Sequence, residues 1–344
     1  MKVLIVNNMA PFIWGGAEFL AEALRTNLQK QGHESEVLRI PFEWDPPEVI
    51  LSQMLMVRAL ELPNVDRVIA LKFPAYLIRH PHKTLWIMHQ YRQAYDLYDT
   101  DGSNLTGEMG KDIKSVIEEA DQQAFAESRK LFVNSPTTQS RLQKYSGVES
   151  RVLICPVNDS ELFSNGKHED YMFVGGRVNL MKRQHLLLEA LALADSSVKL
   201  IIAGPPDHES DAQRLQEITC RLGLQGRVKL DLRMLSREEY AIYMRNSLCA
   251  ASLPFDEDSM SYVAMEAATA QKSIVTTTDS GGVLALVKSH VTGWVAPPDP
   301  QSLSEVLSDA FRNRATTIEY GQNAKQQLDL LGINWMNTIE TLLQ

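Results

Sequence analysis

The sequence contains little cysteine, and none of it forms closely spaced pairs. Its three cysteines, Cys155, Cys220 and Cys249, stand far apart in the chain, and no CxxC pair occurs. A zinc site or a small disulfide framework requires cysteines at close, regular spacing. The cysteines are therefore expected to be free thiols in a reducing cytosol, and both kinds of site are excluded.

Long hydrophobic runs are also missing. No apolar run reaches the roughly 18 residues that a membrane-spanning helix requires. The opening MKVLIVNN has only a short apolar run before Asn7 and Asn8, so we interpret it as a first β-strand and not as a signal peptide. The chain is therefore expected to be cytoplasmic, and peripheral contact with the inner face of the membrane stays open.

Positive charge is scarce as well. The chain has 34 Lys and Arg against 43 Asp and Glu, a net charge of −9, and no dense basic block stands out. Because nucleic-acid binding depends on clustered cations, no nucleic-acid partner is expected. The dinucleotide fingerprint GxGxxG is absent after the first expected strand, which disfavours a nicotinamide dehydrogenase.

The chain does contain a regular alternation of short β-rich runs and amphipathic helical stretches. Strands are expected at 2–6, 35–40, 66–72, 83–89, 130–135, 171–176, 198–204, 227–232, 247–253 and 272–278. Helices are expected at 17–32, 186–194, 211–224, 238–246, 261–270 and 333–343. This alternation predicts an α/β protein with parallel sheets wrapped by helices.

The length of the chain favours two such domains. At 344 residues it is too long for one typical core, and a segment rich in Pro, Asn, Ser and Gly between about 150 and 170 indicates a linker. We therefore predict two Rossmann-like domains that face each other across a cleft. Ligands of such sheets bind at the carboxyl ends of the strands, so the loops there are where a site is expected.

Three of these loops carry candidate residues. Gly15 and Gly16 stand directly before a helix, where they permit either close approach of an anionic ligand or only a turn. In GGRVNLMKRQHLLLEA, Arg177 and Lys182 suit a diphosphate; a solvated basic loop is the alternative, and Arg183 could replace Lys182. His89 follows an expected strand and is either functional or an ordinary rim histidine.

The fourth candidate is the stretch PFDEDSMSYVAMEA. Its acids before the expected helix start near Ser261 are explained by the helix dipole, but Glu266 inside an apolar helix is not. Asp258 and Glu266 can both face one ligand, and each carboxylate can accept two hydroxyl hydrogen bonds. Cations for a diphosphate and acids for hydroxyls together indicate a nucleotide sugar.

Several segments of the chain resemble the family-4 glycosyltransferases of the GT-B fold (glycosyl transferases group 1). They are GGRVNLMKRQHLLLEALA, KLIIAG, RVKLDLRMLSREEYAIYMRNS and PFDEDSMSYVAMEAATAQKSIVTTTDSGG, with VNSPTTQSRL near the end of the first half. INWMNTIETLL is similar to the family's terminal helix, which crosses back onto the N-terminal domain. The resemblance covers nearly the whole chain.

The resemblance implies retaining transfer of a hexose from a nucleotide-diphosphate sugar, with a UDP-glucose-like donor favoured and no metal ion or other cofactor. The acceptor would be a glycan or a lipid-linked glycan in envelope or exopolysaccharide synthesis. An acceptor-binding domain would span 1–155, a donor-binding domain 156–325, and the terminal helix 326–344. No protein general base is implied, since the departing phosphate could take the proton of the acceptor.

By position in the family's motifs, Arg177 and Lys182 would hold the diphosphate and Glu266 the ribose hydroxyls. Asp258 or, through a shift of one residue, Glu257 would lie near the ring hydroxyls of the sugar, and His89 near its C6 hydroxyl. Gly15 and Gly16 would let the first domain close on the diphosphate, and Leu232, Arg233 and Met234 would line the base. The backbone amides of Met260, Ser261, Tyr262 and Val263 would contact sugar and phosphate.

One departure from the family pattern keeps alternatives open. The family's Glu-Gly-Phe-Gly is replaced by Asp-Ser-Met-Ser at 258–261, so Ser259 and Ser261 stand where the family has glycine. Serine limits the backbone angles beside the sugar. A non-catalytic nucleotide-sugar-binding homologue and a nucleotide-sugar epimerase of the same architecture are the alternatives. The apolar stretch 51–62 is either a lipid-facing patch or a buried helix.

Overall fold

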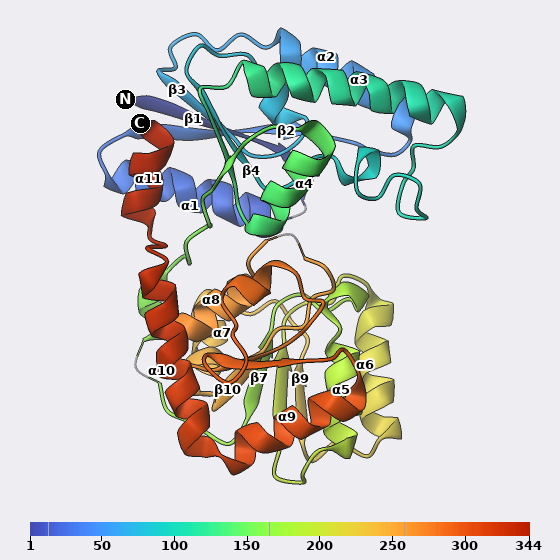
Figure 1. Cartoon of the computed structure of the whole chain (residues 1–344), viewed down its shortest axis with the longest axis vertical. Helices are drawn as coiled ribbons and strands as arrows, with labels where there is room; N and C mark the ends of the chain where they lie inside the picture. The colour runs from blue at the N-terminus through green and yellow to red at the C-terminus, as the bar shows by residue number, and fades with distance from the viewer. Residues whose placement is uncertain (13, 165, 258) are drawn as a thin grey trace. The chain divides into compact units, whose positions relative to one another are not determined.

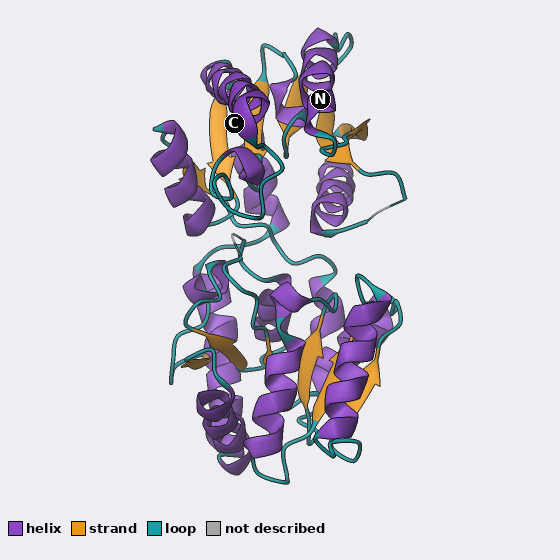
Figure 2. Ribbon diagram, turned by 90° about the vertical axis from the view of Figure 1, so that its right-hand side faces the viewer, coloured by secondary structure: helices purple, strands orange, loops and turns teal. Residues whose placement is uncertain are grey.

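The computed structural model describes residues 1–12, 14–164, 166–257 and 259–344, which divide into two compact units. Unit 1 comprises Met1–Pro156 and Ile333–Gln344, and unit 2 comprises Val157–Gly332. Each unit is a sheet with helices on both faces (Figures 1 and 2). The predicted α/β class is therefore confirmed.

Unit 1 contains a six-stranded sheet in the order β2-β1-β3-β4-β5-β6, with all neighbours parallel. Helices α2 and α3 cover one face of it, and α1, α4 and α11 lie on the other (Figure 1). The elements are β1 (Lys2–Met9), α1 (Gly16–Lys30), β2 (Glu34–Pro41), α2 (Ile50–Ala59), β3 (Arg67–Ala70), the short helix η2 (Ala75–Leu77), β4 (Lys83–Ile87), α3 (Gly107–Ala126), β5 (Lys130–Val133), α4 (Pro136–Ser146), β6 (Arg151–Val152) and α11 (Trp335–Leu343).

The terminal helix α11 belongs to unit 1. It packs against α1, and the hydroxyl of Thr84 on β4 donates to the carbonyl oxygen of Leu342 at 3.1 Å. Its apolar residues fall on one face, where Ile339 and Leu342 are buried. Burial of such a stripe stabilises a short helix that would be marginal alone.

Unit 2 contains a second six-stranded parallel sheet, in the order β12-β11-β10-β7-β8-β9. Contacts pair α5 with α6 and α9, and α8 with α7 and α10. The elements are the short helix η4 (Ser160–Phe163), β7 (Met172–Gly175), the short helix η5 (Leu180–Lys182), α5 (Gln184–Leu193), β8 (Leu200–Ala203), α6 (Glu209–Arg221), β9 (Val228–Asp231), α7 (Arg237–Asn246), β10 (Cys249–Ala251), α8 (Tyr262–Thr269), β11 (Ile274–Thr277), β12 (Gly293–Ala296), α9 (Pro300–Arg312) and α10 (Arg314–Leu330).

In unit 2 the direction in which the chain adds strands to the sheet reverses between β7 and β10, and we call this place the switch point. From β7 the chain runs outward through β8 and β9 and then returns to the other side of β7, where β10 pairs with it. Loops that leave neighbouring strands in opposite directions open a crevice, which is where ligands of such sheets bind. The loops after β7 and β10 carry the expected phosphate-binding and acidic residues.

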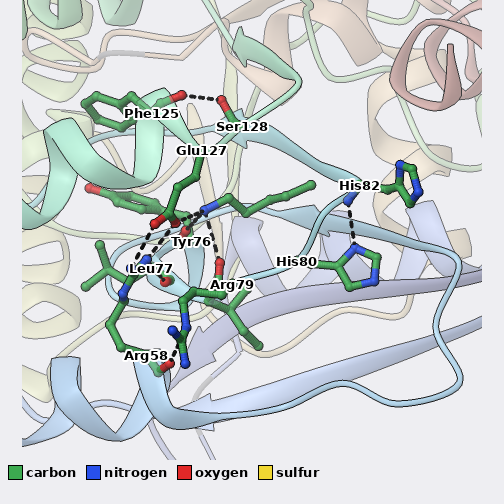
Figure 3. Close-up of polar contacts among 11 residues, drawn as sticks. Arg58, Tyr76, Leu77, Arg79, His80, His82, Phe125, Glu127 and Ser128 are labelled. Atoms are coloured by element: carbon green, nitrogen blue, oxygen red, sulfur yellow. Dashed lines mark hydrogen bonds and ion pairs between the residues drawn. The ribbon is translucent and has the colours of Figure 1, made fainter.

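A charged network fastens unit 1 at the amino end of its sheet (Figure 3). Arg58 at the end of α2 donates to both oxygens of Glu127 at 2.7 and 2.9 Å. The ammonium group of Lys83, which is fully buried, donates to the carbonyl oxygen of Ile78 at 3.0 Å and lies 3.6 Å from Glu127. Arg79 donates to the carbonyl oxygen of Arg58 at 3.0 Å. Arg79 and Lys83, at the two ends of the basic turn 79–83, are therefore both held by contacts within unit 1.

The structure also bears on the apolar stretch 51–62 and on the cysteines. Helix α2 buries Ile50, Met54 and Val57 and exposes Leu55 and Met56, so the stretch 51–62 is buried on one face only. The three cysteines form no disulfide. Within the described residues, no helix is long and apolar enough to cross a membrane.

Candidate functional site

The switch point of unit 2 brings together residues from two loops. The loop after β7 begins with Gly175 and Gly176 and leads through η5, and the loop after β10 leads to the start of α8. Gly176 has a φ of 107°, a conformation that favours glycine, and a Cβ there would lie 3.6 Å from Val263 at the start of α8. The backbone of the first loop therefore runs directly beside the helix start that was expected to bind phosphate.

Lys182 and Glu257 join the two loops. The ammonium group of Lys182 lies 2.7 Å from both carboxylate oxygens of Glu257, and the side chains are 32% and 30% exposed. The main-chain amide of Lys182 donates to the side chain of Asn179, which caps η5. A cation and an acid predicted for one ligand are thus placed together, already paired with each other.

The two arginines of the first loop have different partners. Arg177 is exposed and pairs with Asp207 at 3.2 Å, so its guanidinium remains accessible. Arg183 is largely buried and donates to both oxygens of Asp279 at 2.8 Å and to the carbonyl oxygen of Leu253 at 2.8 Å. Arg183 therefore joins the two loops, whereas Lys182 is more exposed.

The segment before α8 is shaped without the family's glycines. Asp258, predicted as the first acid, lies outside the described residues. Ser261 caps α8 with a φ of −62°, accepts from the amide of Ala264 and bonds the hydroxyl of Ser252 at 2.9 Å. A positive φ is found at Asp256, whereas Ser261 has a negative one. Serine therefore fits the backbone at position 261.

Three of the four residues expected to offer backbone amides stand at the first turn of α8. Ser261 is the N-cap, Tyr262 and Val263 are the first helical residues, and Met260 precedes them, 3% exposed. The first amides of a helix have no partner within it, which makes this end suited to an anion.

Glu266 lies inside α8 with its side chain 5% exposed. Its carboxylate is paired with Arg237 at the start of α7, at 2.7 Å. Burial raises the pKa of Glu266, while the charge and hydrogen bond of Arg237 and a hydrogen bond with Tyr240 lower it. In this structure the buried acid is thus held by an arginine that sequence reasoning missed. The only sequence signal for Arg237 is its place at a helix start, directly after the capping residue Ser236.

The segment expected to line the base follows β9, the edge strand of the sheet. Arg233 is exposed and pairs with Asp231 at 2.8 Å and with Glu239 of α7 at 2.9 Å. Met234 is 72% exposed, whereas Leu232 packs against the core. The ion pair of Arg233 with Glu239 connects this loop to α7. The same helix carries Arg237, which pairs with Glu266.

In unit 1, the glycines after β1 stand at the start of α1. The amide of Gly15 donates to the Glu18 carboxylate at 2.8 Å, so this helix start already holds an anion from its own first turn. The backbone of Gly15 is extended, which any residue adopts. A Cβ on Gly16 would meet nothing within 4 Å. A Cβ on Gly15 would lie 3.3 Å from the Glu18 carboxylate, which would have to move slightly, so only Gly16 can be replaced without a local shift.

His89 lies just beyond the carboxyl end of β4 and is partly buried. Its Nδ1 bonds the carbonyl oxygen of Gln90 at 2.7 Å. Burial, followed by the charge of Lys72, lowers the pKa of His89 to about 4. The ring is therefore neutral at physiological pH, suited to hydrogen bonding with a hydroxyl and not to donating a proton as an imidazolium.

Among the described residues, no group of three or more His, Cys, Asp or Glu side chains is placed to hold a metal ion.

Comparison with known proteins connects this geometry to a family. A profile of the glycosyl transferases group 1 family matches residues 158–327, all within unit 2. No curated protein matches the chain. A structure of HepE from Anabaena in complex with UDP is 19% identical, with a TM-score of 0.71 and 99% of each chain covered.

Two other solved structures share the architecture. Sucrose-phosphate synthase from Thermosynechococcus elongatus is 15% identical, with a TM-score of 0.77, 99% of this chain covered and 96% of that chain. WaaG, a glycosyltransferase involved in lipopolysaccharide biosynthesis, is 15% identical, with a TM-score of 0.69 and 99% and 98% covered. Residues 158–327 match the glycosyl transferases group 1 family, and the chain is a glycosyltransferase with the GT-B fold.

Proposed function

We propose that this glycosyltransferase moves a hexose from a UDP-sugar, with UDP-glucose the favoured donor, with retention of configuration and without a metal ion. The observation that carries the proposal is the meeting of Lys182 and Glu257 at the switch point of unit 2. Phosphate oxygens suit the cation and sugar hydroxyls suit the carboxylate. Structures of HepE from Anabaena with UDP and with UDP-glucose support this donor class.

Unit 2 would bind the donor. Arg177 and Lys182 would hold the diphosphate and offset the charge that develops on the leaving group. Lys182 would exchange Glu257 for phosphate oxygens, and because the pair is partly exposed this exchange costs only about 0–1 kcal/mol. Amides at the start of α8 would add donors, and Glu266 would accept the ribose hydroxyls.

Unit 1 would bind the acceptor, a glycan or lipid-linked glycan of envelope or exopolysaccharide synthesis. His89, neutral at physiological pH, would bond a hydroxyl of the donor sugar, and the space around Gly16 would leave room for the diphosphate. The proton of the acceptor would pass to the departing phosphate, so no protein base is assigned. The enzyme would act in the cytoplasm, with peripheral contact at the membrane where its acceptor is lipid-linked.

The test uses water as the acceptor, because the natural acceptor is not identified. The protein is incubated with UDP-glucose in excess EDTA, and released glucose is followed by proton NMR before its anomers equilibrate. The proposal predicts α-glucose, metal-independent release, and a loss of at least about tenfold in Lys182→Ala. Lys199→Ala, an exposed lysine next to the amino end of β8, is the matched control.

Two results would contradict the proposal. Initial release of β-glucose would exclude retention. Loss of release in EDTA with recovery on adding Mg²⁺ would exclude metal independence.

A further inference from the structure

Arg237 is the group that meets the buried Glu266. It lies at the first position of α7, and its Nη2 is 2.7 Å from Oε1 of Glu266 in α8. A buried carboxylate without a partner is strongly unfavourable, and a paired one is tolerated. The pair therefore explains how α8 can contain an acid among Ala264, Met265 and Ala267, all buried.

The guanidinium of Arg237 is itself fixed from several sides. It lies over the rings of Phe163 and Tyr240, 4.7 and 5.6 Å from their centroids. Its Nη2 also donates to the carbonyl oxygen of Asn158 at 3.2 Å, and its Nε is 3.9 Å from Asp159. Aromatic faces and backbone contacts that immobilise a planar cation also fix the direction in which it presents its donors.

Tyr240 connects this pair to the donor loop. A Cβ built on Gly175 would lie 2.3 Å from the Tyr240 hydroxyl, so only glycine lets the tyrosine reach the end of β7. Phe173 on the same strand packs against the Tyr240 ring, with centroids 5.2 Å apart. The pair of Arg237 and Glu266 therefore sits beside the loop that leads to Arg177 and Lys182.

The arginine controls the charge of the acid. Burial raises the pKa of Glu266, and the charge and hydrogen bond of Arg237 are the largest effects that oppose it. A protonated carboxyl has fewer acceptor positions for hydroxyl groups than a carboxylate. Loss of Arg237 would therefore raise the pKa of Glu266 further and weaken it as an acceptor.

We propose that Arg237 is a positioning residue for the nucleotide donor. It holds the Glu266 carboxylate ionised and oriented beside the end of β7, so that the carboxylate can accept the ribose hydroxyls of a nucleoside diphosphate. This inference rests on the proposed function, which assigns the ribose to Glu266.

The other titratable groups named here, on or beside the elements packed against α8, are paired elsewhere, exposed or neutral, except Asp159, which faces Arg237. On α10, Arg314 pairs with Asp170 and Lys325 with Asp329, while Glu319 is exposed. On β10, burial raises the pKa of Cys249 to about 12, so its thiol is neutral. Beside η4, Asp159 faces Arg237, and Glu161 is exposed. On α7, burial raises the pKa of Tyr240, so this hydroxyl is also neutral.

The test measures the dissociation constant of UDP by calorimetry at pH 6 and pH 8 for the full chain. UDP titrates in this range itself, so the ratio of variant to wild type is compared at each pH. Arg237→Gln should weaken UDP by at least about tenfold at pH 6 and by less at pH 8, and Arg237→Lys should restore most of the loss. Arg245→Gln, whose guanidinium bonds Leu162 of η4 from the same helix, is the control.

A double variant keeps the test informative if Arg237→Gln does not fold. Glu266→Gln removes the buried charge, so the pair Arg237→Gln and Glu266→Gln leaves no carboxylate unpaired. If Arg237 acts through Glu266, the double variant binds UDP as Glu266→Gln alone does. A further loss in the double variant, or a ratio for Arg237→Gln that is the same at both pH values, would overturn the inference.

UDP binding by the wild-type protein tests the proposed function, and UDP binding by Arg237→Gln tests the role of Arg237. If the wild-type protein does not bind UDP at millimolar concentration, both are overturned. If it binds UDP, and Arg237→Gln binds it equally well at both pH values, only the role of Arg237 is overturned.

Discussion

At the scale of single residues, three side chains of unit 2 that we propose bind the donor are each paired with an oppositely charged side chain. Lys182 is paired with Glu257, Arg177 with Asp207, and Glu266 with Arg237. The first two pairs are partly exposed and contribute about 0–1 kcal/mol each, so they exchange partners at little cost. In the third pair the Glu266 carboxylate is buried, and loss of Arg237 would leave its charge uncompensated. The first two pairs can therefore separate when a ligand binds, whereas the pair of Arg237 and Glu266 is expected to persist.

The competition between Glu257 and phosphate for Lys182 gives a prediction. Glu257→Gln frees the ammonium group, so UDP should bind about two- to fivefold more tightly, with the melting temperature nearly unchanged. Calorimetric titration of UDP measures this, and Glu305→Gln on the exposed face of α9 is the control. Weaker binding of UDP to Glu257→Gln would show that the carboxylate holds the nucleotide itself.

A second residue-scale prediction concerns Asp121 in unit 1. This buried acid accepts hydrogen bonds from the hydroxyls of Tyr76 at 2.9 Å and Tyr95 at 2.8 Å, with Gln90 at 3.4 Å. Burial raises its pKa from 3.8 to about 7. Between these values the folded state binds more protons than the unfolded state. The protonated Asp121 therefore contributes its full stabilisation of the folded state below about pH 4. This contribution is lost as the pH rises to about 7.

Asp121→Asn should remove this dependence. The variant should gain stability relative to wild type by about 2–4 kcal/mol between pH 4.5 and pH 8. Urea unfolding at both pH values measures the difference. A constant difference between variant and wild type would show that Asp121 does not titrate in this range.

At the scale of elements, the hydrophobic pattern predicted most strands because parallel strands buried on both faces are continuous apolar runs. All five residues of β4 are buried, for example. The strand β12 was not predicted, since GWVA is four residues long and starts at Gly293, which has a φ of 158°. The long helices α3, α9 and α10 were not assigned ranges from the sequence either, although α9 is strongly amphipathic, with Leu303 and Leu307 buried.

The network at the amino end of the sheet in unit 1 gives an element-scale prediction. Glu127 follows α3 and joins Arg58 at the end of α2 to Lys83 at the start of β4 (Figure 3). Glu127→Gln leaves a buried ammonium without its acid, so unfolding free energy should fall by about 1–3 kcal/mol. Urea unfolding measures this, with Glu119→Gln on the exposed side of α3 as control. Equal stability of the two variants would contradict a joining role.

At the scale of the whole molecule, the order of strands explains which part of the site the sequence could predict. Residues at the carboxyl ends of β7 and β10 meet because these strands are neighbours at the switch point of unit 2. Motif positions therefore led to Arg177, Lys182, Glu257 and Glu266. Arg237 could not be found this way, because its contact with Glu266 depends on how α7 and α8 pack, and no local pattern encodes that.

We propose above all that unit 2 of this glycosyltransferase binds a UDP-sugar through Lys182 and Glu266. The most direct test is thermal unfolding of the full chain with UDP, UDP-glucose, UDP-N-acetylglucosamine, GDP-mannose or NAD, in EDTA. A ligand at a hundred times its dissociation constant stabilises by about 2.7 kcal/mol, which raises the midpoint by a few degrees. We predict such a rise with UDP and UDP-glucose and its loss in Lys182→Ala and Glu266→Gln, but not in Lys199→Ala. No rise with any nucleotide at millimolar concentration, or a rise that both site variants retain, would contradict the account.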